Sequence, residues 1–307
     1  TDDSAAVDQP AHDDGGGSDD RGTEVVPAIE VPRSEPIGDL EMMAVERPDV
    51  NWRIVRIDVE TGEEVGLISE SSARRFLPSL SPDRRTVLVT DDTARELWAF
   101  SADGAESRRL ADDMGQDARA NWSTDGTRIV YASIPDSGLP SLTVIDLVSG
   151  ERIVLLEDAV EESDPTWMPD GSALVFTKII DGVPQLAMLA MDDPAGEPEL
   201  LLPDRNTPQS DARFSPDGRY LAFSERPTAD DPSRLVVATP DGVDLMTTVF
   251  EDNDRGPSWS PDSTMLAFET QRGEQGWSIY RIDIDTGGDS AVEVRDGPGF
   301  DGHASWS

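Results

Sequence analysis

The sequence predicts an all-β protein, a six-bladed β-propeller whose blades are four-stranded antiparallel sheets. Three observations predict this fold. A short turn motif recurs every 42 to 47 residues, each copy is followed by further short apolar runs, and the end of the chain supplies a strand that the first unit lacks. Four short strands in about 45 residues is the period of a propeller blade.

The repeated motif places an aromatic residue or leucine before a turn of the type Ser-Pro-Asp-Gly. The aspartates of successive copies are separated by 42, 45, 47 and 45 residues. Proline fixes φ at the second turn position, and glycine adopts the left-handed conformation that ends a tight hairpin loop. The copies begin at Leu80, Trp122, Trp167, Phe214 and Trp259.

Each turn is followed by three apolar runs, which the second copy shows clearly. Its runs are Ile129–Tyr131, Leu142–Leu147 and Arg152–Leu156. Together with the strand that carries the aromatic residue, they make four strands in one unit, as a blade requires.

The two ends of the chain complete one another. Residues Asp39–Ile68 contain the later runs of a unit but lack its initial strand. The last segment of the chain, His303–Ser307, has the pattern of that missing strand. Trp306 in that segment lies 47 residues after Trp259. We expect the C-terminal strand to complete the first blade and close a ring of six. The alternative is a chain cut inside a seventh unit.

Residues 1–34 are expected to form a disordered acidic tail, and residues 35–307 the propeller. The tail is rich in Asp, Gly, Ser and Pro and holds too little apolar surface to offset its ordering entropy. The chain begins with Thr1 and not with methionine, which is compatible with a removed signal peptide and with a trimmed N-terminus. A tail of this kind can link a lipid anchor to a domain, and a tail without an anchor is the alternative.

Composition excludes several classes of function. The chain has 63 acidic and 25 basic residues and a net charge of −38, which repels nucleic-acid phosphates and anionic membranes. No apolar run approaches the roughly 18 residues of a membrane-spanning helix. Cysteine is absent, which removes disulfides, thiolate metal sites and cysteine nucleophiles.

The motif Trp-Ser-Pro-Asp-Gly followed by Leu-Ala-Phe resembles the repeat of the TolB-like β-propellers and their WD-like (PD40) relatives. Phe214–Ser224 is the nearest copy, and the resemblance covers residues 36 to 307. It implies a periplasmic or cell-surface module that binds protein. Related propellers also form the gating domain of prolyl-oligopeptidase-like enzymes. TolB itself has a separate N-terminal α/β domain, whose place is taken here by the acidic tail.

The aromatic residues of the repeat are expected to be buried between neighbouring blades rather than to form a ligand platform. They are Trp122, Trp167, Phe214, Trp259 and Trp306. The aspartates of the repeated turns suit the local hydrogen bonds of those turns.

A second set of aspartates precedes the initial strand of successive units, with spacings of 47, 47, 43 and 47 residues. Such positions converge on the central channel of a propeller. They therefore predict an acidic ring at one mouth, which would attract a cation or a basic segment of a partner. The alternative is coincidence, because about a fifth of the residues are acidic and the distance to the aromatic residue slips by two positions. The set is Asp117, Asp164, Asp211, Asp254 and Asp301.

Asp283, Asp285 and Asp289 alternate along a short segment and are minor candidates for calcium ligands. They lack the spacing and terminal glutamate of an EF-hand loop, so a charged hairpin loop is favoured. Bases for catalysis are scarce, since the chain has two histidines, His12 and His303. No Gly-x-Ser-x-Gly motif is present either, and a Ser-His-Asp hydrolase is excluded within these residues.

These observations predict an exported, monomeric, non-enzymatic propeller in the cell envelope, either periplasmic or at the cell surface. It would bind a protein, peptide or other ligand at a mouth of its ring and would use no cofactor other than calcium. The alternative is the propeller of, or derived from, a prolyl-oligopeptidase-like or metal-dependent hydrolase.

Overall fold

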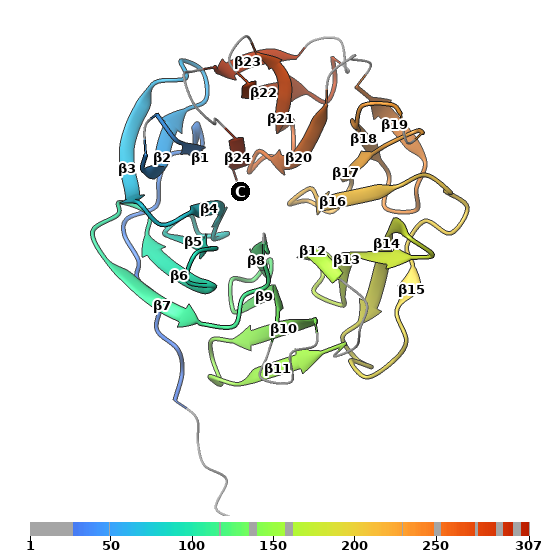
Figure 1. Ribbon diagram of the computed structural model, residues 1–307, viewed down its shortest axis with the longest axis horizontal. Coiled ribbons are helices and arrows are strands. Elements are labelled where there is room, and N and C mark those ends of the chain that lie inside the picture. Colours follow the sequence, from blue (N-terminus) through green and yellow to red (C-terminus); the bar gives the residue numbers. More distant parts are fainter. Residues whose placement is uncertain are drawn as a thin grey trace, which may run out of the picture.

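Six four-stranded antiparallel sheets surround a central axis in the computed structural model (Figure 1). The structure describes residues 27–48, 50–116, 118–134, 140–156, 162–228, 230–248, 253–273, 276–286, 291–296 and 302–306. All elements in these ranges are strands, and the part of the chain described holds no helix long and apolar enough to cross a membrane. The predicted six-bladed propeller is confirmed.

The first three blades are built from the N-terminal half of the chain and the last strand. From the axis outward, blade 1 contains β24 (Gly302–Ser305), β1 (Glu41–Glu46), β2 (Trp52–Asp58) and β3 (Glu64–Ser71). Blade 2 contains β4 (Arg75–Leu80), β5 (Thr86–Asp91), β6 (Glu96–Ser101) and β7 (Ser107–Ala111). Blade 3 contains β8 (Ala120–Trp122), β9 (Arg128–Ser133), β10 (Ser141–Asp146) and β11 (Arg152–Leu155).

The remaining blades follow in sequence order. Blade 4 contains β12 (Glu162–Trp167), β13 (Ala173–Ile180), β14 (Val183–Ala190) and β15 (Glu199–Leu200). Blade 5 contains β16 (Gln209–Phe214), β17 (Leu221–Glu225), β18 (Arg234–Ala238) and β19 (Asp244–Thr247). Blade 6 contains β20 (Asp254–Trp259), β21 (Met265–Gly273), β22 (Gly276–Asp283) and β23 (Val292–Arg295).

The ring is closed by the C-terminal strand, as the sequence predicts. β24 pairs antiparallel with β1, with Met43 opposite Ser305, and lies next to the axis in Figure 1. Trp306 is fully buried, and its indole N–H donates a hydrogen bond of 2.8 Å to the carbonyl of Asp39. The first and last segments of the propeller are thereby joined within one sheet.

The repeated turns are held by their own side chains. In the copy at Phe214–Gly218, the Ser215 hydroxyl donates to Asp217 at 2.8 Å and accepts the backbone N–H of Tyr220 at 3.0 Å. Gly218 has a φ of +72°, the left-handed conformation that glycine adopts without steric cost. In another copy Arg84 takes the place of this glycine and adopts a φ of +60°.

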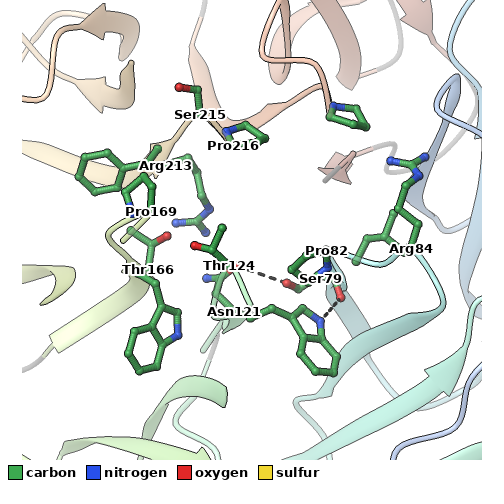
Figure 2. Close-up of a pocket in the computed structure, with 15 residues that line it drawn as sticks. Ser79, Pro82, Arg84, Asn121, Thr124, Thr166, Pro169, Arg213, Ser215 and Pro216 are labelled. Atoms are coloured by element: carbon green, nitrogen blue, oxygen red, sulfur yellow. Dashed lines mark hydrogen bonds between the residues drawn. The ribbon is translucent and has the colours of Figure 1, made fainter. Parts of the chain in front are cut away.

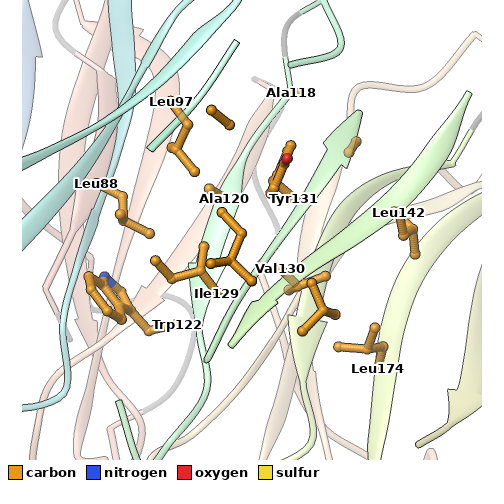
Figure 3. Close-up of a cluster of buried hydrophobic side chains, with 14 of the residues drawn as sticks. Leu88, Leu97, Ala118, Ala120, Trp122, Ile129, Val130, Tyr131, Leu142 and Leu174 are labelled. Carbon is orange, nitrogen blue, oxygen red and sulfur yellow. The ribbon is translucent and has the colours of Figure 1, made fainter. Parts of the chain in front are cut away.

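The aromatic residues of the repeat fill the seams between blades. The cluster in Figure 3 joins Leu88 of blade 2, Trp122 of blade 3 and Leu174 of blade 4. The indole N–H of Trp122 donates to the Ser79 carbonyl of the preceding blade at 3.1 Å. Burial of the rings and hydrogen bonding of their polar edge together fix how neighbouring blades pack.

The end of the predicted tail lies along the outside of two blades. The Ile29 N–H donates to Leu147 O in blade 3 at 2.8 Å, and the Thr86 hydroxyl in blade 2 donates to Pro32 O at 2.6 Å. Residues 1–26 lie outside the described ranges. The division into a tail at 1–34 and a propeller at 35–307 therefore stays a prediction.

Candidate functional site in the central channel

A bulge near the start of the inner strands aims side chains at the axis. The register of β12 against β13 shifts between Ser163 and Thr166, and β16 and β20 shift at the equivalent place. Asp164 and Asp211, at the bulges of blades 4 and 5, have φ values of +51° and +56°. A bulge leaves a residue outside the hydrogen-bond ladder and re-aims its side chain, here into the channel.

These bulge positions surround a cavity of about 370 Å³, which we name the charged mouth. Every blade contributes the residue that lies three positions before the aromatic residue of its repeat. In blade 2 the aromatic residue is replaced by Leu80. In blade order the six are Leu77, Arg119, Asp164, Asp211, Gly256 and His303, counted with blade 2 first. Since the chemistry of these six residues differs from blade to blade, the wall of the mouth carries both positive and negative charges.

Two of the five predicted ring aspartates meet in the charged mouth. Asp164 and Asp211 lie in its wall on adjacent blades. The pKa of Asp164 is raised, first because its enclosed position disfavours the charged form and then because Asp211 is close. Asp211 accepts hydrogen bonds from the hydroxyls of Ser210 at 3.3 Å and Ser224 at 3.1 Å.

Asp254, a third member of the predicted set, does not line the charged mouth. It is fully buried two residues before Gly256, and Arg272 donates to its carboxylate oxygens at 2.8 and 2.7 Å. The cause is the slip of two positions, because Asp254 lies five residues before Trp259 and Asp164 only three before Trp167. Asp117 and Asp301 lie outside the described residues.

The other charged groups at this mouth were not predicted as a site. Glu269 on β21 accepts the backbone N–H of His303 at 2.6 Å and lies 3.1 Å from the Arg255 guanidinium. Burial acts to raise the pKa of Glu269, but His303 and Arg255 outweigh it and lower that pKa to about 2. Arg119 and His303 could have been found in the sequence, because each lies three residues before an aromatic residue of the repeat, as Asp164 and Asp211 do. No sequence signal points to Glu269, because its place depends on β21 packing beside β24.

The opposite mouth is lined by the repeated turns and is chemically different. This proline mouth is a cavity of about 200 Å³ around which the prolines of four turns gather, with Thr124 in the fifth (Figure 2). The prolines are Pro82, Pro169, Pro216 and Pro261. Arg213 reaches into this cavity from the channel side (Figure 2).

The minor calcium candidates do not come together as a metal centre. Asp283 accepts the backbone N–H of Asp285 at 2.9 Å, a local turn interaction, and Asp289 lies outside the described residues. Across the described ranges, no group of three or more His, Asp or Glu side chains is placed to hold a metal ion. Calcium binding stays a prediction.

Comparison with known proteins places the chain in a family. The family model of the TolB beta propeller domain (PD40) matches residues 133–307, more than half of the chain. The chain belongs to the TolB β-propeller family. The predicted resemblance is thereby confirmed.

Two relatives carry different names. The chain is 29% identical over 164 residues to "Uncharacterized peptidase YuxL" of Bacillus subtilis, covering 50% of this chain and 22% of that protein. It is 26% identical over 112 residues to "Tol-Pal system protein TolB" of Desulfosudis oleivorans, covering 36% and 25%. The matches therefore span about a quarter or less of these curated relatives.

Solved structures agree on the fold. TolB from Acinetobacter baumannii superimposes with a TM-score of 0.72 at 17% identity, covering 87% of this chain and 67% of that one. An oligogalacturonate lyase in complex with manganese gives a TM-score of 0.55 at 14% identity, covering 79% and 70%. At these identities the likeness concerns the fold alone.

Proposed function

We propose that this TolB-family propeller is a monomeric, non-enzymatic binding module outside the cytoplasm, and that its charged mouth holds a basic segment of a protein partner. The observation that carries the proposal is the pair Asp164 and Asp211 in the wall of a 370 Å³ cavity. Neither carboxylate lies within ion-pair distance of a described basic residue, and Arg119 and Arg213 offset the raised pKa of Asp164 only in part. The match to a Tol-Pal system protein supports an envelope partner.

The electrostatics of the pair favour a cationic ligand. Two neighbouring carboxylates in an enclosed site repel one another, which contributes to the raised pKa of Asp164. A lysine or arginine side chain between them would relieve that repulsion and stabilise the ionised form. Glu269 does not compete for the same ligand, because Arg255 already pairs with it at 3.1 Å. The net charge of −38 would steer a basic segment toward the protein.

Calorimetric titration with a short peptide tests the proposal. The peptide carries a blocked N-terminus and a single lysine between uncharged residues, and its control carries norleucine in place of lysine. At about 150 mM salt, where exposed charges are screened, we expect the lysine peptide to bind and the control not to bind. Asp164→Asn and Asp211→Asn should each weaken binding by about tenfold or more, because each leaves the ligand's charge less compensated.

The matched control is Asp285→Asn, which removes one exposed carboxylate away from the channel and should leave the affinity unchanged. Equal weakening by all three variants would show that only overall charge attracts the peptide. Binding that is unchanged in Asp164→Asn and Asp211→Asn would contradict the proposed site.

The match to a named peptidase favours a second candidate, the propeller domain of a peptidase. The complete gene product should then cleave peptide p-nitroanilides and react with a fluorophosphonate probe, although the chain described here contains no Gly-x-Ser-x-Gly motif. A complete gene product that neither cleaves these substrates nor reacts with the probe would reject this candidate.

A further inference from the structure

Between the two mouths lies a small chamber of about 50 Å³ on the axis of the propeller. Arg119 lines both the chamber and the charged mouth, whereas Arg213 lines both the chamber and the proline mouth. The walls also carry the hydroxyl groups of Ser79, Ser258 and Ser305. The chamber therefore has the Arg119 guanidinium on the side of the charged mouth and the Arg213 guanidinium on the side of the proline mouth.

Neither guanidinium lies within ion-pair distance of a described carboxylate, although Asp164 and Asp211 act on Arg213 from farther away. Arg119 is 5% exposed, its Nε is buried without a hydrogen-bond partner, and no described carboxylate lies within ion-pair distance. Arg213 donates one hydrogen bond of 2.6 Å, to the carbonyl of Ala212. Arg119 is buried and Arg213 is partly buried, and neither forms a short ion pair with a described carboxylate. A buried charge is costly unless something compensates it.

Two of the three serine hydroxyls in the chamber wall are left to donate, whereas the Ser79 hydroxyl already donates to the Asn121 amide oxygen at 3.4 Å. The Ser258 hydroxyl oxygen accepts the backbone N–H of Trp306 at 2.9 Å, and the Ser305 hydroxyl oxygen accepts that of Leu80 at 3.0 Å. Each hydroxyl therefore keeps its single proton to donate. An arginine side chain can only donate. A chamber whose walls offer N–H and O–H groups selects an acceptor that carries negative charge.

We propose that the chamber binds one small anion, a halide or a single carboxylate group, between Arg119 and Arg213. A volume of about 50 Å³ exceeds what one water molecule needs, so a small ion has room there. The electrostatics agree with the geometry, because burial and the nearby charge of Arg119 lower the pKa of Arg213 to about 10 even though Asp164 and Asp211 act to raise it. An anion between the two would offset both effects.

This site is distinct from the proposed peptide site. The anion is held by Arg119 and Arg213 inside the channel, whereas the basic segment is held by Asp164 and Asp211 at one mouth. The two sites adjoin, because Arg119 also lines the charged mouth. Their tests are separate, since a lysine peptide tests the aspartates and a small anion tests the arginines.

Thermal unfolding of the protein at constant ionic strength tests the proposal. Gluconate, a much larger anion, is replaced stepwise by bromide in one series and by acetate in another. We expect a saturable rise in the unfolding temperature in at least one series. Arg119→Met and Arg213→Met should shift the half-saturating concentration upward by about tenfold or more, because each removes charged hydrogen bonds to the anion.

Arg226→Met is the matched control, because Arg226 is exposed and its loss changes the net charge equally. It should titrate like the unchanged protein. An acetate response without a bromide response would assign the site to a carboxylate, and a response to both would assign it to small anions in general. A titration that is flat in both series, or that Arg226→Met alters as much as Arg119→Met does, would overturn the proposal.

Crystals grown in sodium bromide give an answer that does not depend on how the variants fold. We expect an anomalous peak in the chamber within hydrogen-bond distance of Arg119 and Arg213 when bromide stabilises the protein. Density for acetate at the same place is expected when only acetate does so. A chamber filled by neutral water in both crystal forms would overturn the proposal.

Discussion

Arg84 is the residue on which the closure of the ring can be tested most sharply. Its buried guanidinium donates to four backbone carbonyls around the closing strand, those of Ile37 at 3.2 Å, Trp306 at 2.7 Å, Glu41 at 2.8 Å and Gly38. Burial lowers the pKa of Arg84, which shows that the environment disfavours an isolated charge there. The four carbonyls are therefore what makes the position tolerable for arginine.

The change Arg84→Met keeps the aliphatic stem and removes all four hydrogen bonds. A hydrogen bond contributes about 1 kcal/mol net, so four contribute up to about 4 kcal/mol, and loss of the buried charge itself returns part of this. We expect a destabilisation of about 2–4 kcal/mol, measured by urea unfolding with tryptophan fluorescence and circular dichroism.

The neighbouring change Arg85→Met is the matched control. The Arg85 side chain is 39% exposed, and its nearest carboxylate, on Glu35, is 3.9 Å away. Its replacement should therefore alter stability by less than about 0.5 kcal/mol. The reasoning is refuted when Arg84→Met and Arg85→Met unfold at the same urea concentration.

Three further changes test the packing and the charged mouth. Trp306→Ala should cost about 3–5 kcal/mol in the same urea assay, because a fully buried indole leaves a cavity in the closing blade. The pKa of Glu269 is lowered to about 2 from an ordinary value of 4.5, so its contribution to stability is complete above pH 4.5 and is lost as the pH falls toward 2. Glu269→Gln should therefore flatten the dependence of the unfolding free energy on pH between 4.5 and 2. An unchanged slope would contradict the pairing of Glu269 with His303 and Arg255. The pKa of Asp164 is raised, so its ionised form lowers stability at pH values above its ordinary pKa. Asp164→Asn should therefore raise the unfolding temperature at pH 7 but not at pH 3, and scanning calorimetry that finds the variant less stable at pH 7 would contradict the cause assigned here.

The fold could be predicted from the sequence because one physical unit is repeated. Each blade needs the same turn and the same buried aromatic, so the pattern is visible even where Arg84 replaces glycine or Thr124 replaces proline. The closing strand was predictable for the same reason, because Trp306 continues the spacing of the earlier aromatics.

The site could be predicted only in part because its residues do not repeat. The position three residues before the aromatic is Asp in two blades but Arg119, Gly256 and His303 in others, so a search for one residue type finds Asp164 and Asp211 and misses the rest. The same search also finds Asp254, whose carboxylate pairs with Arg272 instead of lining the mouth. Only the register of the bulge separates these two kinds of aspartate.

The most direct test of the proposed function uses the scarcity of histidine. The chain has two histidines, His12 and His303, and His303 lines the charged mouth. In a sample labelled with ¹³C-histidine, with the signals assigned by a His12→Gln variant, the lysine peptide should shift the ring resonances of His303 in a saturable way. The norleucine peptide should not shift them. A lysine peptide that binds by calorimetry while the His303 resonances stay in place would contradict binding at this mouth.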